Sequence, residues 1–285
     1  MSMIRAASLA AFLAGLFGLG LAAVLVLFAP PARAAETPFA RTQGAEVRLL
    51  AGAVKDGALE AGVEIRLAPG WKTYWRYPGD SGIPPRFDWS NSRNVSGVTV
   101  AFPAPRRFSD GGGGYSVGYK GSVVLPVRVA LTDPARATRL DLSLDFAVCD
   151  ALCVPAHVQI SLDVPPGGGD EPGLAFAAAA LPVKTPLGAP GSLGIQAVSV
   201  DTSQAPPVVV VKARGGPKAD LFAEGPTEAW ALPLPSREEA ADGSLTFRFA
   251  LDGLPKDATW PGAMLRLTLS EQGKAIETQV PLQQP

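Results

Sequence analysis

The two cysteines of the chain, Cys149 and Cys153, stand four positions apart and are the residues best suited to chemistry. Two thiols at this spacing can form a reversible disulfide, and thiol:disulfide exchange requires little more than an accessible sulfur and a thiolate. A disulfide between them closes a very short loop, so it restricts the unfolded chain only slightly and adds little to a large domain. The spacing therefore favours redox chemistry. A non-redox binding module with a structural disulfide is the alternative.

The first 34 residues predict export across a membrane. Arg5 precedes an apolar run over residues 6–29, and residues 32–34 (Ala-Arg-Ala) have the small-x-small pattern that signal peptidase accepts. We expect cleavage there, so that the mature protein starts near Ala35. The run also reaches the ~20 residues that span a bilayer, so an uncleaved anchor is the alternative. Both outcomes place the folded part in an oxidising compartment, the bacterial periplasm, where two cysteines tend to pair.

Metal binding is a second chemistry that this region could perform. His157 is the sole histidine of the chain and follows Cys153 by four residues. Cys149, Cys153 and His157 would offer a soft three-ligand site for Cu(I), which thiolates prefer. A strand alternates its faces, however, so convergence of all three side chains needs a bend at Pro155. We expect no metal and no cofactor, and keep these three residues as the alternative site of a copper-binding protein.

The composition indicates an all-β protein. The 285 residues include 31 Gly and 28 Pro, about a fifth of the chain, which is typical of many short strands and turns. The formal net charge is −1 and the sequence has no run of Lys or Arg, so the charge pattern of a nucleic-acid-binding protein is missing. We expect two immunoglobulin-like β-sandwiches in tandem, over residues 35–165 and 191–285, with a linker over residues 166–190.

The strands expected around the cysteines place the pair on a hairpin. Residues 140–148 show a clear strand pattern that ends at Cys149, and the apolar alternation resumes over residues 154–164. The pair would therefore lie on a connection between two antiparallel strands. Elsewhere, alternation predicts a strand over residues 59–67, the alanine-rich residues 174–181 predict a short helix, and residues 229–232 predict one of the short strands of the second sandwich.

Two further stretches are unusual. Residues 71–77 contain four aromatic side chains and precede a Gly/Pro-rich loop, which indicates either a core or a surface for a partner. Residues 111–114 are four consecutive glycines, which predict a mobile loop flanked by Phe108 and Tyr115. No GxxxxGK[ST] pattern is present, so the glycines do not predict a phosphate site.

These stretches occur in an order that resembles the periplasmic N-terminal domain of the DsbD family of thiol:disulfide interchange proteins, and most closely the subgroup that includes the copper-tolerance protein ScsB. The resemblance covers most of residues 47–164. Residues 208–282 resemble, more weakly, the second immunoglobulin-like domain of that subgroup. The segments that carry the resemblance are WKTYWR (71–76), PGDSGIPP (78–85), FPAP (102–105), GY (118–119), LP (125–126), CDALCVP (149–155) and LFAEGP (221–226).

The resemblance implies a relay of electrons. In the family, this domain takes electrons through a cysteine pair from a thioredoxin-like or membrane-embedded donor and passes them to periplasmic proteins that bear disulfides. The chain would then be a component of a protein-disulfide reductase, in a family linked to cytochrome c biogenesis. By position, Cys149 and Cys153 would be the redox pair, covered by a cap with an aromatic residue. The neighbours and cap residues that the resemblance implies are Tyr74, Phe108, Asp110, Tyr115 and Tyr119.

The sequence also departs from the family pattern. Glycines stand in the middle of the cap, which leaves Phe108 and Tyr115 as candidates for the aromatic cover, and the cysteines are closer together than in the best-known members. Family members usually continue into a multi-helix membrane domain and a thioredoxin-like domain, whereas this sequence has no CxxC motif. We therefore expect a separate protein to reduce the pair, and contact with the membrane only through an uncleaved N-terminal segment.

Overall fold

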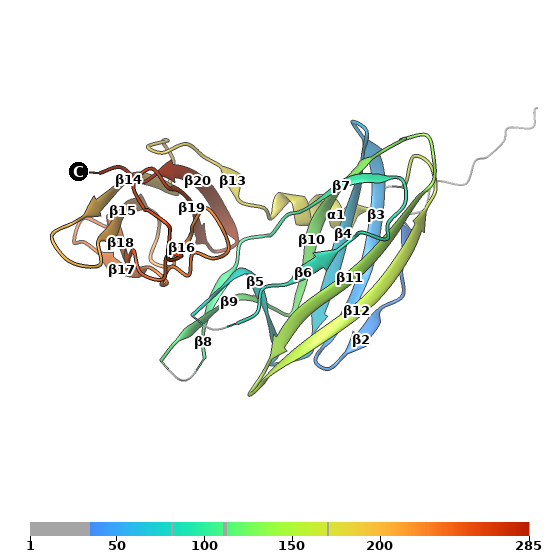
Figure 1. Ribbon diagram of the computed structural model, residues 1–285, viewed down its shortest axis with the longest axis horizontal. Coiled ribbons are helices and arrows are strands. Elements are labelled where there is room, and N and C mark those ends of the chain that lie inside the picture. Colours follow the sequence, from blue (N-terminus) through green and yellow to red (C-terminus); the bar gives the residue numbers. More distant parts are fainter. Residues whose placement is uncertain (1–34, 81, 111–112, 170, 285) are drawn as a thin grey trace, which may run out of the picture. The chain divides into compact units, whose positions relative to one another are not determined.

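The computed structural model describes residues 35–80, 82–110, 113–169 and 171–284. The predicted signal peptide lies outside the described residues, as do Gly111 and Gly112 of the predicted mobile loop. The described residues form four sheets and one short helix (Figure 1). The predicted all-β class with two sandwiches is therefore confirmed.

The first sandwich consists of two six-stranded sheets. In the first sheet the strand order is β1-β3-β4-β10-β7, and β2 also pairs with β3. In the second sheet the order is β12-β11-β5-β9-β8, and β6 also pairs with β11. The strands are β1 (Ala35–Glu36), β2 (Ala40–Thr42), β3 (Ala45–Lys55), β4 (Ala58–Leu67), β5 (Lys72–Gly79), β6 (Arg86–Asp88), β7 (Val95–Val100), β8 (Arg106–Ser109), β9 (Tyr115–Lys120), β10 (Ser122–Leu131), β11 (Thr138–Cys149) and β12 (Cys153–Val164).

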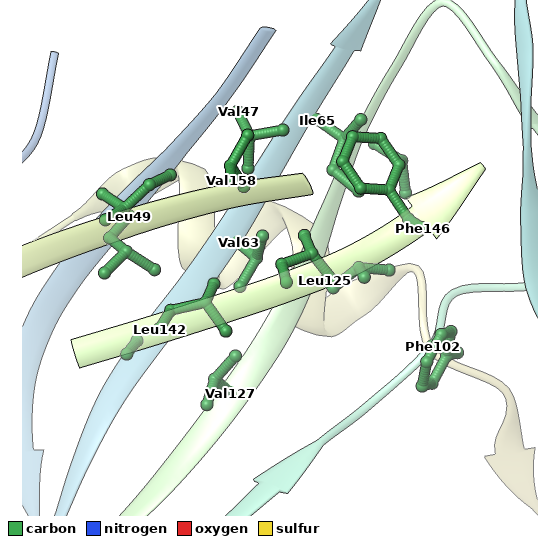
Figure 2. Close-up of a cluster of buried hydrophobic side chains, with 14 of the residues drawn as sticks. Val47, Leu49, Val63, Ile65, Phe102, Leu125, Val127, Leu142, Phe146 and Val158 are labelled. Atoms are coloured by element: carbon green, nitrogen blue, oxygen red, sulfur yellow. The ribbon is translucent and has the colours of Figure 1, made fainter. Parts of the chain in front are cut away.

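The core of the first sandwich forms between its two sheets, because alternate residues of each strand are apolar and face the opposite sheet. Figure 2 shows this for Val63 and Leu125 of the first sheet and Leu142 of the second, which belong to one buried cluster. Burial of each such side chain contributes roughly 1.5–3 kcal/mol. The alternation expected over residues 59–67 is confirmed by the side chains that are at most 9% exposed: Leu59, Ala61, Val63, Ile65 and Leu67.

The hairpin of β11 and β12 carries the cysteines. Both strands have twelve residues, and they pair without a break from Thr138 opposite Val164 to Cys149 opposite Cys153. Figure 1 shows the two strands side by side as a long hairpin. The predicted position of the pair, at the connection of two antiparallel strands, is confirmed. Because so many backbone hydrogen bonds support this ladder, the hairpin is a firm base for the two sulfurs.

The aromatic run and the cap segment are also parts of the second sheet. Tyr74, Trp75 and Tyr77 lie on β5, which pairs with β9, and β9 pairs with β8. The residues on both sides of the predicted glycine loop pair with each other as strands β8 and β9. Between them, the Asp110 N–H donates to the Gly114 carbonyl oxygen at 3.1 Å. We refer to β8, β9 and the residues between them as the cap hairpin.

Residues 166–190, the expected linker, contain regular structure. The alanine-rich segment forms the predicted helix, α1 (Pro172–Ala179), and β13 (Val183–Lys184) pairs with β20 of the second sandwich. The boundaries of the linker stay a prediction. In the described part of the chain, no helix has the length and apolar character needed to cross a membrane.

The second sandwich has two four-stranded sheets, in the orders β13-β20-β19-β16 and β14-β15-β18-β17. The prediction of a strand over residues 229–232 was wrong. This segment is irregular, and burial of Trp230 and Leu232 in the core accounts for its apolar pattern. The remaining strands are β14 (Gly194–Asp201), β15 (Val208–Arg214), β16 (Asp220–Glu224), β17 (Ser236–Glu239), β18 (Leu245–Ala250), β19 (Met264–Glu271) and β20 (Lys274–Pro281).

Candidate functional site

Cys149 and Cys153 form a disulfide across the end of the β11–β12 ladder. Residues directly opposite each other in an antiparallel pair extend to the same side of the sheet, so the register brings the two sulfurs together. The Cα atoms of the two cysteines are 4.1 Å apart. In the connection between the strands, the Asp150 N–H donates to the Leu152 carbonyl oxygen at 3.2 Å. The local chain thus builds the pair without help from distant segments.

The two sulfur-bearing residues differ in exposure. Cys149 is 1% exposed and packs with Tyr74 and Ala147, whereas Cys153 is exposed. The neighbouring Leu152 side chain is 78% exposed. Cys153 is therefore the more accessible of the two cysteines to an incoming thiolate.

Tyr74 places its hydroxyl group between the two sulfurs. Its Oη lies 2.9 Å from Sγ of Cys149 and 3.0 Å from Sγ of Cys153. Burial of the ring, and next the negative charge of Asp110, raise the pKa of the Tyr74 hydroxyl, so this group stays protonated. Disulfide sulfurs have no hydrogen, so the hydroxyl is the donor. A thiolate accepts a hydrogen bond far better than a disulfide sulfur does, so the bond strengthens as the disulfide opens.

Several contacts hold Tyr74 in this place. The preceding residue, Thr73, pairs with Val148 of β11, and its hydroxyl donates to the Ala147 carbonyl oxygen at 2.8 Å. Gly82 packs against the tyrosine ring so closely that a Cβ atom at this position would lie 2.4 Å from a ring carbon. Its φ of 149° also favours glycine. The loop after β5 therefore covers the ring only because residue 82 has no side chain.

The cap hairpin is tied to the loop after β5. The Tyr115 N–H donates to Oδ2 of Asp80 at 2.9 Å, and the Tyr115 carbonyl oxygen accepts from the Asp80 N–H at 3.1 Å. The Tyr115 ring is 42% exposed, and the guanidinium group of Arg107 lies 5.6 Å from its centre. Asp80 thus fixes the start of β9 beside the loop that contacts Tyr74.

The other predicted cap residues have different surroundings. Phe108 lies on β8, with Nζ of Lys120 at 5.0 Å from its ring centre. Tyr119 is 8% exposed, belongs to the core of the first sandwich and donates a hydrogen bond to the Pro103 carbonyl oxygen at 2.8 Å. Tyr119 is therefore a core residue on the strand beside Tyr74. The aromatic residue that bonds the sulfurs comes from β5.

The side chains of the alternative metal site do not converge. Nδ1 of His157 lies 2.7 Å from Oδ1 of Asp145, its partner across the β11–β12 ladder. Along a strand, four positions correspond to about 13 Å, so His157 lies far from Cys153. Within the described ranges, no group of three or more His, Cys, Asp or Glu side chains could hold a metal ion.

Sequence reasoning did not identify Gly82 and Asp80 as supports of the site. Both belong to the segment PGDSGIPP, which contributed to the family resemblance. A glycine followed by a proline pair indicates a loop with a special backbone, but it does not indicate which side chain the loop covers. The contact with Tyr74 could be found only in the folded chain.

Comparisons with known proteins identify a matching family model and a similar fold. Residues 44–165 match the family model of the N-terminal domain of the thiol:disulfide interchange protein DsbD. No match was found among curated proteins. Among solved structures, the chain is similar to the N-terminal periplasmic domain of ScsB from Proteus mirabilis, with a TM-score of 0.70 and 24% identity over 89% of this chain and 100% of that chain. This structural likeness shows the fold, and the family match together with the disulfide supports thiol:disulfide interchange.

Proposed function

We propose that the protein relays electrons by dithiol/disulfide exchange in the periplasm, and the premise is the match of residues 44–165 to the DsbD N-terminal family model. One observation supports the proposal most strongly: the hydroxyl of Tyr74 bonds both sulfurs of a pair in which Cys149 is buried and Cys153 is exposed. A disulfide that served only as a staple would need neither an accessible sulfur nor a donor for a thiolate.

Reduction of the pair starts at Cys153. A thiolate of the donor attacks Sγ of Cys153 and forms a mixed disulfide, while the bond to Cys149 breaks and its electron pair stays on Cys149 as a thiolate. The Tyr74 hydroxyl stabilises this thiolate. The second thiolate of the donor then attacks the donor's own first sulfur and releases Cys153 as a thiolate. Two electrons have passed to the pair, and the donor has gained a disulfide.

Transfer to a substrate runs through the same sulfur. The Cys153 thiolate attacks one sulfur of the substrate disulfide, and the other sulfur leaves as a thiolate. The Cys149 thiolate then attacks Sγ of Cys153, which restores the intramolecular disulfide and releases the first substrate sulfur. The substrate receives the two electrons that the pair had gained.

The partners in this proposal are proteins. The two cysteines of this sequence form the pair itself, and we assign the first step to a thioredoxin-like or membrane-embedded donor. The acceptors are periplasmic proteins that bear disulfides. The chemistry needs no metal and no cofactor, because sulfur carries the electrons in both steps.

The test is whether the folded protein exchanges its disulfide. We expect the pair to equilibrate with mixtures of reduced and oxidised glutathione while circular dichroism shows an intact fold. Cys149→Ser should accumulate a mixed disulfide through Cys153, because no resolving thiolate remains. The matched variant Cys153→Ser should accumulate much less, because its remaining sulfur is buried. A disulfide that opens only when the protein unfolds would refute the proposal.

A further inference from the structure

The strand that carries Tyr74 leaves the regular ladder directly after this residue. Tyr74 pairs with Gly118 of β9, and the next pair is Gly79 with Ser116. Residues 75–78 of β5 therefore stand opposite the single residue Val117. An insertion of this kind interrupts the backbone pairing and bends the strand. We call residues 75–78 the β5 bulge.

Contacts with the second sandwich support the β5 bulge. The ring of Trp75 packs edge-on against Phe222 of β16, with 5.8 Å between ring centres, and both residues are fully buried. The Tyr77 hydroxyl donates to the Leu232 carbonyl oxygen. Burial, and next the charges of Asp80 and Glu224, raise the pKa of Tyr77 to about 12, so this donor is retained at physiological pH.

Arg76 makes the strongest of these contacts. Its Nε and Nη2 donate to the two carboxylate oxygens of Glu224 at 2.8 and 2.7 Å, and Nη2 also donates to Glu277 at 2.9 Å. The three side chains are only 19%, 13% and 14% exposed. Bidentate, largely buried ion pairs of this kind hold their partners in one geometry. Residues 75, 76 and 77 thus each have a partner in the second sandwich.

We propose that the second sandwich is a positioning element of the redox site: by holding the β5 bulge, chiefly through Arg76, it keeps the Tyr74 hydroxyl at hydrogen-bond distance from both sulfurs. Tyr74 is the last residue before the ladder shifts, so its position depends on the residues that follow it. When the bulge loses its anchor, the hydroxyl leaves the sulfurs and the Cys149 thiolate loses its donor. Arg76 is then a positioning residue, because it acts through Tyr74.

This inference gives the second sandwich a role in the proposed function and rests on that function for its consequence. The second sandwich contains no cysteine and no histidine. Its contribution to exchange is therefore geometric. The contact lies on the strand that also carries Tyr74, so the effect needs no long pathway through the protein.

The experiment compares Arg76→Met with a matched control in the full chain. Arg48 is the control, because its side chain is 20% exposed, bonds two carboxylates, Glu36 and Glu64, and covers the ring of Phe39. It lies on β3 of the other sheet. We expect Arg76→Met to shift the equilibrium constant with glutathione about tenfold toward the disulfide, about 30 mV for a two-electron couple, because the reduced form loses its donor. Arg48→Met should shift it less than about twofold.

A double-mutant cycle separates positioning from general loosening. Tyr74→Phe should give the same tenfold shift, and adding Arg76→Met to it should change the constant no further. Arg76→Lys, which keeps the charge, should recover part of the shift and provides the measurement if Arg76→Met does not fold. The inference would be overturned if the shifts of Tyr74→Phe and Arg76→Met added in the double variant. It would also be overturned if Arg76→Met and Arg48→Met gave equal shifts. If the wild-type pair exchanges with glutathione and neither Arg76→Met nor Arg76→Lys shifts the equilibrium constant, the positioning role is wrong and the proposed function stands. If the wild-type pair does not exchange with glutathione, the proposed function is wrong as well.

Discussion

Cys149 and Cys153 are register partners at the end of the β11–β12 ladder, but they differ in their access to solvent. Cys149 is 1% exposed and packs with Tyr74, whereas Cys153, which follows Leu152 in the chain, is exposed. Both sulfurs lie at hydrogen-bond distance from the Tyr74 hydroxyl, so the two cysteines share a donor and differ only in exposure.

The difference in exposure predicts unequal reactivity after reduction. In the reduced, folded protein we expect iodoacetamide to modify Cys153 at least about tenfold faster than Cys149, since a reagent reaches only exposed thiolates. Peptide mass spectrometry after short reaction times measures both rates. In denaturant the two rates should become similar. Faster modification of Cys149 in the folded protein would contradict the assigned order of attack.

Tyr74→Phe should slow exchange without disturbing the fold. The variant keeps the ring and removes one hydrogen bond to a thiolate, a loss of about 1.5 kcal/mol that corresponds to a rate roughly tenfold lower. The rate of reduction by dithiothreitol, followed by thiol labelling, measures the effect. The apparent pKa of the more acidic thiol should rise in the same variant. An unchanged thiol pKa would show that the hydroxyl does not stabilise the thiolate.

Gly82→Ala should reproduce part of the Tyr74→Phe effect. The added Cβ would lie 2.4 Å from the tyrosine ring, so the loop or the ring has to move. Gly97→Ala is the matched control, because a Cβ at that position meets nothing within 4 Å. We expect slower reduction by dithiothreitol for Gly82→Ala and no change for Gly97→Ala. Equal rates for the two variants would remove Gly82 from the site.

Leu152→Ser should affect exchange with proteins more than exchange with small thiols. The side chain is 78% exposed and borders the attacked sulfur, so it can contact a protein donor but is not needed by glutathione. Unfolding free energy should stay within about 0.5 kcal/mol of the wild type, as for most surface substitutions. Leu187→Ser, at an exposed leucine outside the site (43%), is the control. Stopped-flow measurements give the rate of reduction of each variant by a thioredoxin-like donor and by glutathione. Equal slowing of Leu152→Ser with both reductants would contradict the prediction.

The raised pKa of Tyr77 predicts that the protein loses stability at alkaline pH. Burial first, then Asp80 and Glu224, raise its pKa from 10 to about 12. The folded state therefore holds this proton more tightly than the unfolded state, and the associated stability is complete below pH 10 and is lost as the pH rises toward about 12. Urea unfolding at pH 9, 10 and 11 should show a steeper decline for the wild type than for Tyr77→Phe. Parallel declines would contradict the assignment.

Local sequence patterns were sufficient for several parts of the fold. The alternation over residues 59–67 corresponds to a strand whose alternating apolar side chains are buried, and the pattern on both sides of the cysteines corresponds to a hairpin with the pair at its turn. These features depend on residues close together in the chain. The segment 229–232 shows the limit, because Trp230 and Leu232 are buried in irregular structure that produces the same apolar pattern as a strand.

The surroundings of the sulfurs depended on contacts between distant residues. The sequence by itself determined the two cysteines, their hairpin and the all-β class, because these follow from spacing and side-chain alternation. The resemblance implied that Tyr74 is a neighbour of the pair. Only the tertiary structure decided that its hydroxyl bonds both sulfurs, that Tyr119 enters the core, and that Arg76 binds Glu224. Alternation along a strand shows which face is buried, but it does not specify which strand or which sandwich packs against that face.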